Sequence, residues 1–312
     1  MVRSGRQSAD NISRCGLEGV NGAFPRVHRP RVIVRNVTVP VHGLSTELAG
    51  FRIAHISDFH FRRWNRVHQA AQDLLLTLEY DLLVVTGDFC VNAHRLAKSI
   101  DLTRRFFEPI AERSPVYAVL GNHDHPAILT SPDMPLVFLR NQSVLIQRAG
   151  AVLKLAGVDQ SHFGEERLDS ALAGSGPRRF TILLAHYPST VFRLPAGRVD
   201  LQLSGHTHGG QIRFPYLGCL WTNDLIPRRM AGGLHRLAGT PLHISSGIGV
   251  SLPLPVRINC PPELAVLTLH TVEHEERSTP AEALVTAASP SHNRVSLDTP
   301  FVLYYTWHWR NS

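Results

Sequence analysis

Short apolar runs that each stop at a polar residue recur through the middle of this chain. The clearest run covers residues 82–86, Leu-Leu-Val-Val-Thr, and stops at Gly87 and Asp88. An unbroken run of apolar and β-branched residues of this length predicts a strand that is buried on both faces. Ligands bind beyond the carboxyl ends of the strands in open α/β sheets, so Asp88 stands at a position suited to chemistry rather than to packing.

Similar runs predict further strands on both sides of this one. Residues 31–40 alternate between valine and polar residues, apart from one slip at Asn36, which is typical of an edge strand. The remaining runs predict strands over residues 51–57, 116–120, 144–146, 152–158, 181–185, 199–204, 242–245 and 264–270.

Two segments show the period of an amphipathic helix instead. Residues 66–79 place apolar residues at i, i+3, i+4, i+7, i+8 and i+11, which predicts a helix with one apolar face. A second helix is predicted over residues 93–112, with Leu96, Ile100, Phe107 and Ala111 on one side. Helices that alternate with strands early, followed by a β-rich second half, predict an α/β fold of two packed sheets flanked by helices.

The composition changes near both ends of the chain. The chain has 312 residues, of which 43% are hydrophobic and 18% charged, so it is long and apolar enough to bury a core. Residues 1–30 are rich in glycine, arginine, asparagine and serine without any period, and we expect a loosely ordered, basic N-terminal segment there. We expect the folded domain over residues 31–270 and a poorly ordered or peripheral C-terminal tail over residues 271–312.

The basic charge of the chain favours anionic partners. The net charge is +7, which favours phosphoesters, nucleic acid or an acidic membrane surface. The arginines occur as scattered pairs, such as Arg62-Arg63 and Arg228-Arg229, and no polybasic arm is present. We therefore expect no dedicated nucleic-acid binding.

The sequence contains no segment that predicts insertion into a membrane. It has no run of 18 apolar residues, and residues 1–30 lack the apolar core of a secretory signal. We therefore expect a cytoplasmic protein, with peripheral contact to the inner membrane left open as an alternative. A misplaced start codon that dropped an upstream anchor would leave the same pattern.

Five of the apolar runs end in side chains that can bind a metal ion. A single aspartate or histidine after a strand is more often a cap or a turn residue. Five such endings in succession favour one site, because residues from separate strand ends converge in a single crevice. The endings are Asp58 with His60, Asp88, Asn122 with His123, His186, and His206 with His208.

Nitrogen and oxygen are the expected ligand atoms. The four cysteines lie far apart and form no metal-binding spacing, whereas the chain contains 18 histidines. Imidazole, carboxylate and amide ligands suit manganese, iron or zinc and do not distinguish among them.

The order of these motifs resembles one known enzyme family. The motifs Asp58-Phe59-His60, Gly87-Asp88, Gly121-Asn122-His123-Asp124, His186 and Gly205-His206-Thr207-His208 resemble those of the calcineurin-like metallophosphoesterases, and the resemblance covers residues 31–270. It implies a four-layer αββα sandwich of two mixed β-sheets flanked by helices. Residues 203–211, 245–251 and 259–263 are similar to the bacterial branch of small phosphodiesterases that includes some UDP-2,3-diacylglucosamine pyrophosphatases.

The resemblance also implies a binuclear metal centre. One of two divalent or trivalent transition-metal ions would be held by Asp58, His60, Asp88 and His208, and the other by Asp88, Asn122, His186 and His206. Asp88 would bridge the ions, and His123 would face the substrate and steady or protonate the leaving oxygen. Two dications held by two carboxylates leave a surplus of positive charge, which attracts a phosphoester.

Three functions follow from this interpretation. The leading one is a two-metal phosphoesterase that hydrolyses a phosphodiester or pyrophosphate bond of a small molecule, by attack of a hydroxide that bridges the metals. The second is a lipid-precursor pyrophosphatase of the UDP-2,3-diacylglucosamine type, whose lipid-linked substrate the apolar residues 251–255 would suit. The third is a metal-free scaffold of the same fold, against which the complete ligand set argues. The natural substrate, the metal identity and the oligomeric state stay open.

Overall fold

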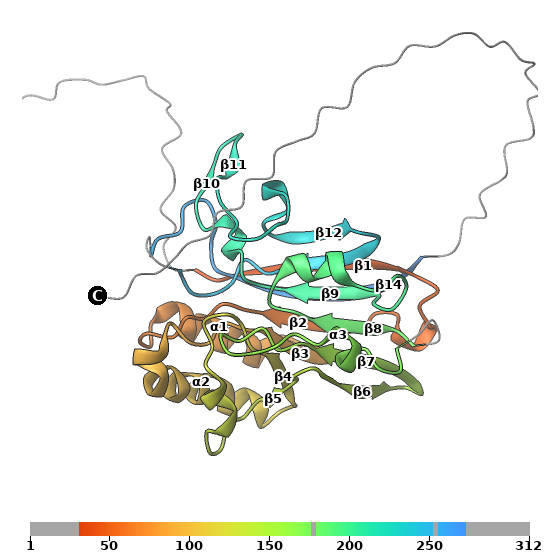
Figure 1. The fold of residues 1–312 in the computed structure, drawn as a ribbon, viewed down its shortest axis with the longest axis horizontal. Coiled ribbons are helices and arrows are strands. Elements are labelled where there is room, and N and C mark those ends of the chain that lie inside the picture. The colour runs from red at the N-terminus through yellow and green to blue at the C-terminus, as the bar shows by residue number, and fades with distance from the viewer. Residues whose placement is uncertain (1–30, 176–178, 252–254, 273–312) are drawn as a thin grey trace, which may run out of the picture. The chain divides into compact units, whose positions relative to one another are not determined.

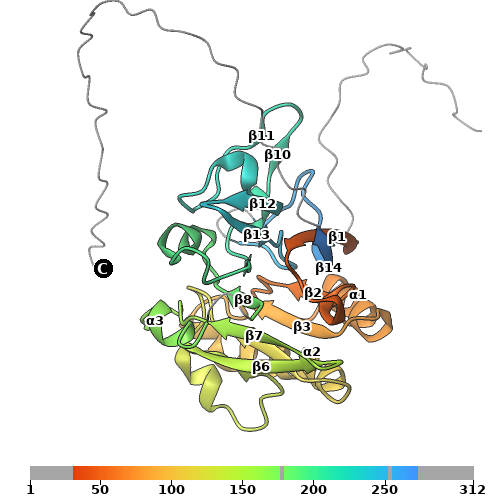
Figure 2. The same cartoon turned by 90° about the vertical axis from the view of Figure 1, so that its right-hand side faces the viewer.

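The computed structural model describes residues 31–175, 179–251 and 255–272. Figures 1 and 2 show two β-sheets packed against each other, with helices α1 (Arg66–Thr77) and α2 (Leu96–Ala111) on the outer side of one of them. The predicted N-terminal segment and the predicted tail beyond Val272 lie outside the described residues. The predicted division of the chain into three segments therefore stays a prediction.

The first sheet contains six strands in the described part of the chain. In spatial order they are β1 (Ile33–His42), β14 (Glu263–Val272), β2 (Arg52–Ile56), β3 (Leu82–Thr86), β4 (Val116–Val119) and β5 (Val137–Phe138). β1 lies at the edge, as predicted, and pairs in parallel with β14 over ten residues. β14 runs antiparallel to β2, and β2 to β5 are parallel to one another. The carboxyl ends of β2, β3 and β4 therefore meet at one end of this sheet.

The second sheet also contains six strands within the described residues. Its spatial order is β12 (Gly233–Leu237), β13 (Thr240–Ile244), β9 (Leu201–Ser204), β8 (Thr181–Leu184), β7 (Ala151–Gly157) and β6 (Gln142–Arg148). The four central strands are parallel, and each outer strand is antiparallel to its neighbour. A separate two-stranded hairpin pairs β10 (Arg213–Phe214) with β11 (Gly218–Cys219).

The helices cover the two outer faces unequally. Asn65 caps the N-terminus of α1, because its side chain accepts hydrogen bonds from the backbone N–H groups of Val67 and His68. The second sheet is covered by the four-residue helix α3 (Leu168–Ala171) and by short 3-10 helices. No helix within the described ranges is long and apolar enough to cross a membrane. The 3-10 helices are η1 (Thr46–Leu48), η2 (Ala93–Arg95), η3 (Pro126–Thr130), η4 (Pro188–Arg193), η5 (His208–Gly210) and η6 (Arg228–Met230).

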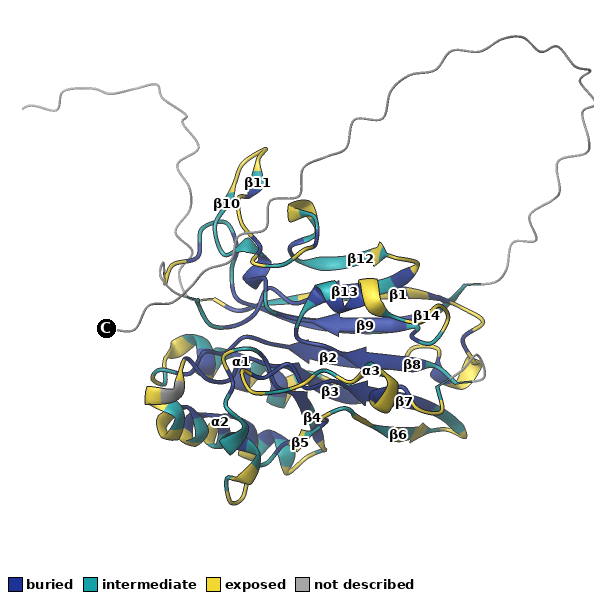
Figure 3. Cartoon of the chain, in the orientation of Figure 1, coloured by how far each residue is buried: buried dark blue, intermediate teal, exposed yellow. Residues whose placement is uncertain are grey.

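The central strands are buried (Figure 3). Their side chains divide between two cores. Leu82 and Val84 of β3 lie in the core between the sheets, whereas Leu83 and Val85 lie in the core that includes Leu75 and Phe106 of the helices. Smaller apolar clusters cover the outer face of the second sheet. The predicted four-layer α/β sandwich of two mixed sheets is confirmed, with one outer layer made of short helices.

Most predicted strands agree with the structure, and the largest difference concerns α2. Of the predicted apolar residues, Phe107 is fully buried, and Leu96, Ile100 and Ala111 are half-buried against the same core. The fully buried side also includes Ser99 and Thr103, which the apolar pattern does not predict. The buried hydroxyl groups are satisfied, because Ser99 donates to the carbonyl of Phe61 and Thr103 donates to the carbonyl of Ser99. The strands β5, β10, β11 and β12 were not predicted.

Candidate metal centre

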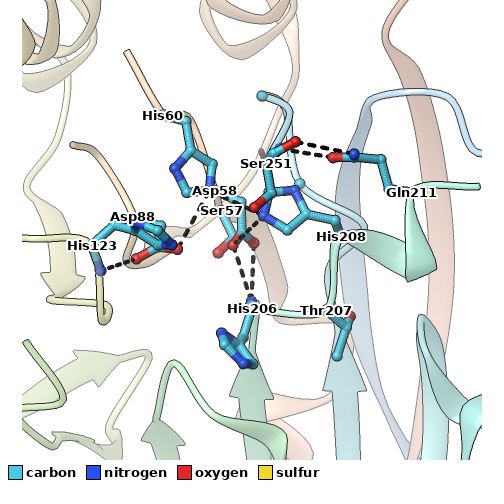
Figure 4. Close-up of polar contacts among 12 residues, drawn as sticks. Ser57, Asp58, His60, Asp88, His123, His206, Thr207, His208, Gln211 and Ser251 are labelled. Atoms are coloured by element: carbon cyan, nitrogen blue, oxygen red, sulfur yellow. Dashed lines mark hydrogen bonds and ion pairs between the residues drawn. The ribbon is translucent and has the colours of Figure 1, made fainter. Parts of the chain in front are cut away.

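The strand ends that carry the predicted site residues lie together. Parallel pairing aligns the ends of β2, β3 and β4 in one sheet, and those of β8 and β9 in the other. Figure 4 shows side chains from both sheets converging. The residues that follow these strands are Asp58 and His60, Asp88, Asn122 and His123, His186, and His206 and His208.

Four of these residues form a compact, buried cluster. One ligand atom from each of Asp58, His60, Asp88 and His208 lies within 4.8 Å of the other three, so the group can hold a metal ion. The Nε2 atoms of His60 and His208 are 3.0 Å apart. His60 Nε2 lies 3.4 Å from Asp88 Oδ2, and His208 Nε2 lies 3.5 Å from Asp58 Oδ1. These four residues are the ones that the family resemblance implies for the first metal.

The residues predicted for the second metal adjoin this cluster through Asp88. His186 Nε2 lies 3.3 Å from Asp88 Oδ2 and 3.1 Å from Asn122 Oδ1. The ring of His206 packs at 71° to that of His186, with 5.1 Å between the ring centroids. The same oxygen of Asp88 thus lies beside His60 and His186, which places this carboxylate between the two groups.

Backbone carbonyl groups orient three of the imidazole rings. The Nδ1 atom of His60 donates to the carbonyl of Cys90 at 3.1 Å, and the Nδ1 atom of His186 donates to that of Thr86 at 2.7 Å. The Nε2 atom of His206 donates to the carbonyl of Asn223 at 2.9 Å. A carbonyl oxygen only accepts hydrogen bonds, so each bonded nitrogen carries the proton. Burial lowers the pKa of His60 and that of His206 to about 4, so the other nitrogen of each of these rings has a lone pair for a metal ion. Burial opposes the protonation of His186, but the adjacent Asp88 raises its pKa to about 9, so His186 would release a proton from Nε2 on binding a metal ion.

The turns that present these side chains use an uncommon backbone conformation. Asp58, His60, Asp88, His206 and His208 all have positive φ values, between 45° and 69°, a region in which aspartate and histidine occur more often than most non-glycine residues. Neighbouring loops hold these turns, because the N–H of Asp58 donates to the carbonyl of Gly87 and that of His60 to the carbonyl of Asp88. Such conformations persist where the surrounding structure fixes them, and they concentrate at functional sites.

Asp124 supports the centre and was not predicted as a site residue. Its buried carboxylate accepts hydrogen bonds from the backbone N–H groups of Asp88, Cys90 and Gly121 at 2.8–2.9 Å. Burial, together with the charge of Asp88, raises the pKa of Asp124 to about 7. The residue ties the loop after β3 to the loop after β4. The sequence feature that points to Asp124 is its position directly after Asn122 and His123.

Arg257 lies behind His208, and no sequence pattern pointed to it. The buried guanidinium donates from Nε to the carbonyl of Gly249 at 2.9 Å, and its Nη2 lies 3.5 Å from His208 Nδ1. Burial lowers the pKa of Arg257. The residue follows His208 by 49 positions, so only the folded chain brings the two together.

The electrostatics of the cluster suit a divalent cation. Burial raises the pKa of Asp58 to about 6 and lowers that of His60 to about 4. Burial opposes the ionisation of Asp88, but the adjacent His186 and His60 hold the pKa of this carboxyl well below its usual range. A buried carboxylate needs a compensating charge, and a cation among these atoms would also accept the imidazole lone pairs. The donor set therefore fits a metal ion with a preference for nitrogen and oxygen ligands.

Two hollows border the centre. One, of about 510 Å³, is lined by Thr207 and His208 and extends to Phe214 and Trp221. The other, of about 710 Å³, is lined by Tyr187, whose ring packs against His206, and by residues 220–225. A substrate can therefore reach the buried cluster from the side of residues 207–225.

Comparisons with known proteins agree with the geometry. The sequence profile described as calcineurin-like phosphoesterase matches residues 51–210. The chain is 30% identical over 233 residues to the uncharacterised metallophosphoesterase YkuE of Bacillus subtilis, with 70% of this chain and 79% of YkuE covered. It is 28% identical over 233 residues to the phosphodiesterase YaeI of Escherichia coli, with 71% of this chain and 83% of YaeI covered.

A third relative covers more of the chain. An uncharacterised metallophosphoesterase of Aquifex aeolicus is 31% identical over 269 residues, which span 80% of this chain and 95% of that protein. The resemblance predicted from the motif series is confirmed by these matches. The chain belongs to the calcineurin-like phosphoesterases, a family of metal-dependent hydrolases of phosphoric esters.

Proposed function

We propose that this protein is a phosphodiesterase with two metal ions in adjoining sites. The observation that carries the proposal is the position of Asp88, whose Oδ2 atom lies 3.4 Å from His60 Nε2 and 3.3 Å from His186 Nε2. One ion would be held by Asp58, His60, Asp88 and His208, and the other by Asp88, Asn122, His186 and His206. When bound, a pair of such ions activates water and neutralises charge on the phosphoryl group.

The charge of the ligands favours an anionic substrate. The seven proposed ligands include two carboxylates, and the other five are imidazoles or an amide. Two dications would therefore keep a net positive charge, which attracts a phosphoester with one or more negative charges. The ligands do not select among manganese, iron and zinc.

His123 is the proposed residue for the leaving group. Its backbone N–H donates to Asp88 Oδ1 at 3.0 Å, and its Nδ1 donates to the carbonyl of Val91 at 3.1 Å. These two bonds fix the ring beside the cluster, with its centroid 4.9 Å from that of His60. His123 is exposed, so its Nε2 is accessible to a leaving oxygen and can deliver a proton to it.

Metal analysis and a small set of esters test the proposal. We expect the full chain to bind two transition-metal ions and to hydrolyse bis(p-nitrophenyl) phosphate when reloaded with manganese, iron or zinc. Asp88→Asn should reduce both metal content and turnover to background, because each ion loses a charged ligand. The control is Asp169→Asn, an exposed aspartate on α3, which should keep both properties.

The competing scaffold hypothesis gives the opposite result. A chain that acts only as an interaction module would contain less than one bound transition-metal ion and would hydrolyse none of the esters with any metal. Retained turnover in Asp88→Asn, by contrast, would show that this carboxylate is not shared by two ions.

A lipid-precursor pyrophosphatase is the second candidate. The observation that favours it is the apolar wall of the hollow beside His208, to which Ile212, Phe214, Leu220 and Trp221 contribute. Part of the apolar segment that also suggested such a substrate, residues 252–254, lies outside the described residues. UDP-2,3-diacylglucosamine should then be cleaved faster than the aryl diester. Absence of any cleavage of this nucleotide lipid would remove the candidate.

A further inference from the structure

Exposed apolar side chains are concentrated in one stretch that projects from the second sheet. Figures 1 and 2 both show the β10–β11 hairpin extending beyond β12, and Figure 3 shows its tip exposed. Six of the eleven large exposed apolar residues among the described residues fall within residues 214–225. Tyr216 is fully exposed, and Leu225, Leu217 and Trp221 are 84%, 76% and 71% exposed. The other two are Leu220 and Phe214.

Arginines lie beside these apolar side chains. A hollow of about 430 Å³ is lined by Arg213, Arg228 and Arg229 together with Tyr216 and Leu217. Arg228 and Arg229 are exposed. We call the six apolar residues and these three arginines the hairpin patch.

The hairpin patch carries positive charge. Residues 213–229 contain a single acidic residue, Asp224. Its carboxylate accepts hydrogen bonds from the hydroxyl of Ser189 at 3.1 Å and from the backbone N–H of Ile226 at 3.1 Å. These bonds hold Asp224 within the local structure, so the hairpin patch offers guanidinium groups beside apolar side chains.

We propose that the hairpin patch docks the protein on the surface of an anionic lipid bilayer. Contiguous exposed apolar surface on a soluble domain marks an interaction site. Tyrosine and tryptophan favour the boundary between acyl chains and water, and arginines close to the surface are attracted to anionic head groups. The leucines and aromatic rings would enter the head-group region while the arginines contact lipid phosphates.

A second copy of the chain suits the hairpin patch less well than a bilayer. A two-fold dimer through this patch would place the same surface on both partners. Each copy would then bring three arginines and a single acidic residue, Asp224, to the interface, and the like net charge of the two surfaces opposes association.

The docked orientation would bring the metal centre close to the lipid surface. Phe214, Leu220 and Trp221 belong to the hairpin patch and also line the hollow that reaches His208. The mouth of the centre would therefore open at the bilayer. Docking itself does not depend on the proposed hydrolysis and can be measured without it.

Vesicle sedimentation with the full chain tests the docking. We expect the protein to sediment with vesicles of equal parts phosphatidylglycerol and phosphatidylcholine, and to sediment much less with phosphatidylcholine alone. Binding should weaken as the salt concentration rises, because salt screens the attraction between arginines and head groups.

Paired variants separate the two parts of the hairpin patch. Arg228→Gln with Arg229→Gln should weaken binding to the anionic vesicles about 30-fold, from the contribution of each basic residue near a charged surface. Tyr216→Ser with Leu217→Ser should weaken binding to vesicles of both compositions. The control is Arg95→Gln with Lys98→Gln, which removes two exposed charges near the start of α2. The midpoint of thermal unfolding verifies that each variant is folded.

Several results would overturn the proposal. These are no sedimentation with anionic vesicles, equal binding to both vesicle types, wild-type binding by the folded hairpin variants, or an equal loss in the control pair. Light scattering that shows a dimer dissolved by Tyr216→Ser with Leu217→Ser would assign the hairpin patch to a second copy instead. Sedimentation by a protein without ester hydrolysis would leave docking supported and the proposed function rejected.

Discussion

His123 is fixed by its neighbours at the rim of the metal centre, whereas the proposed ligands around it are mostly buried. His123→Ala keeps the backbone N–H that donates to Asp88, so the metal content should stay unchanged. Turnover of a diester with an alkyl leaving group should fall about 10²–10⁴-fold, the usual contribution of a positioned acid. A p-nitrophenolate leaving group needs no proton and should be affected far less.

The comparison of the two esters in steady-state kinetics identifies this role. His94→Ala, which changes an exposed histidine in η2, serves as the control. Equal losses for both leaving groups, or a loss of metal from His123→Ala, would contradict the assignment of His123 to the leaving oxygen.

The segment around Gly249 packs closely against the backbone of the Asp58-Phe59-His60 motif. The N–H of Gly249 donates to the carbonyl of Asp58 at 2.7 Å, and an added Cβ would lie 2.1 Å from the carbonyl oxygen of Phe59. Because backbone atoms cannot move aside like a flexible side chain, Gly249→Ala should displace the segment between Asp58 and His60. We expect metal affinity to fall about 10–100-fold, as for other changes to groups that orient ligands.

Isothermal titration calorimetry with manganese measures this loss. Gly232→Ala is the matched control, because its added Cβ would come closest to the side-chain hydroxyl of Ser246, at 3.0 Å, and would lie no nearer than 3.6 Å to any backbone atom of another segment. Unchanged affinity in a folded Gly249→Ala protein would mean that the contact with Phe59 does not position the ligands.

Single residues differ in how far the sequence reveals them. The positions of Asp58, Asp88 and His186 follow from apolar runs that end abruptly, and such endings are visible without a structure. Asp124 and Arg257 act through contacts with backbone or with a ligand from a distant part of the chain. Those contacts exist only after folding, so the sequence marks Asp124 only by its place beside Asn122 and His123 and gives no sign of Arg257.

At the scale of the elements, the N-terminus of α1 is stabilised by the capping residue Asn65. Asn65 accepts hydrogen bonds from the N–H groups of Val67 and His68 at 2.8 and 3.1 Å. Asn65→Ala should lower the free energy of unfolding by about 1 kcal/mol, and Asn65→Asp, which keeps the acceptor, should lower it much less. Urea denaturation measures both changes. Equal stability of all three proteins would show that the cap contributes nothing.

The elements that the sequence predicts are those with a strong local pattern. α1 has a complete apolar stripe, and β3 is apolar or β-branched throughout, so the local sequence of each is enough to predict it. The buried side of α2 includes Ser99 and Thr103, which are polar in sequence and are buried because their hydroxyls find carbonyl partners. β12 has no comparable apolar pattern, and its strand conformation depends on pairing with β13.

At the scale of the whole molecule, two histidines connect the sheets. His55 of β2 and His243 of β13 approach to 2.9 Å between their Nδ1 atoms, and both are fully buried. Burial lowers the pKa of His243 to about 3 and holds that of His55 well below its usual value. Both rings are therefore neutral in the folded protein at neutral pH.

This pair should make the fold sensitive to mild acid. An unfolded histidine has a pKa of about 6.5, so below that pH the unfolded chain binds protons that the folded chain does not. The contribution of the two neutral histidines to the free energy of unfolding is therefore fully present above pH 6.5 and is lost as the pH falls from 6.5 toward 3. When the pH is lowered from 7.5 to 5.5, the free energy of unfolding should fall in both proteins. The fall should be about 1 kcal/mol smaller in His243→Gln than in the wild type, because the variant lacks one of the two buried histidines.

Denaturant unfolding at the two pH values provides this measurement. The exposed His94→Ala serves as the control and should lose as much stability as the wild type. The same loss in His243→Gln as in the wild type would contradict the assignment of a neutral, buried His243.

The pairing of β1 with β14 has a consequence for synthesis of the chain. β14 lies between β1 and β2, so these two strands, which are consecutive within the described residues, are separated in the sheet by a strand that is made more than two hundred residues later. Until β14 is made, β1 has no partner among the described strands of this sheet and β2 has an open edge, which is a site of aggregation. Closure of this sheet must wait for translation of residue 272, and a nascent chain stalled earlier should require a chaperone to cover that edge.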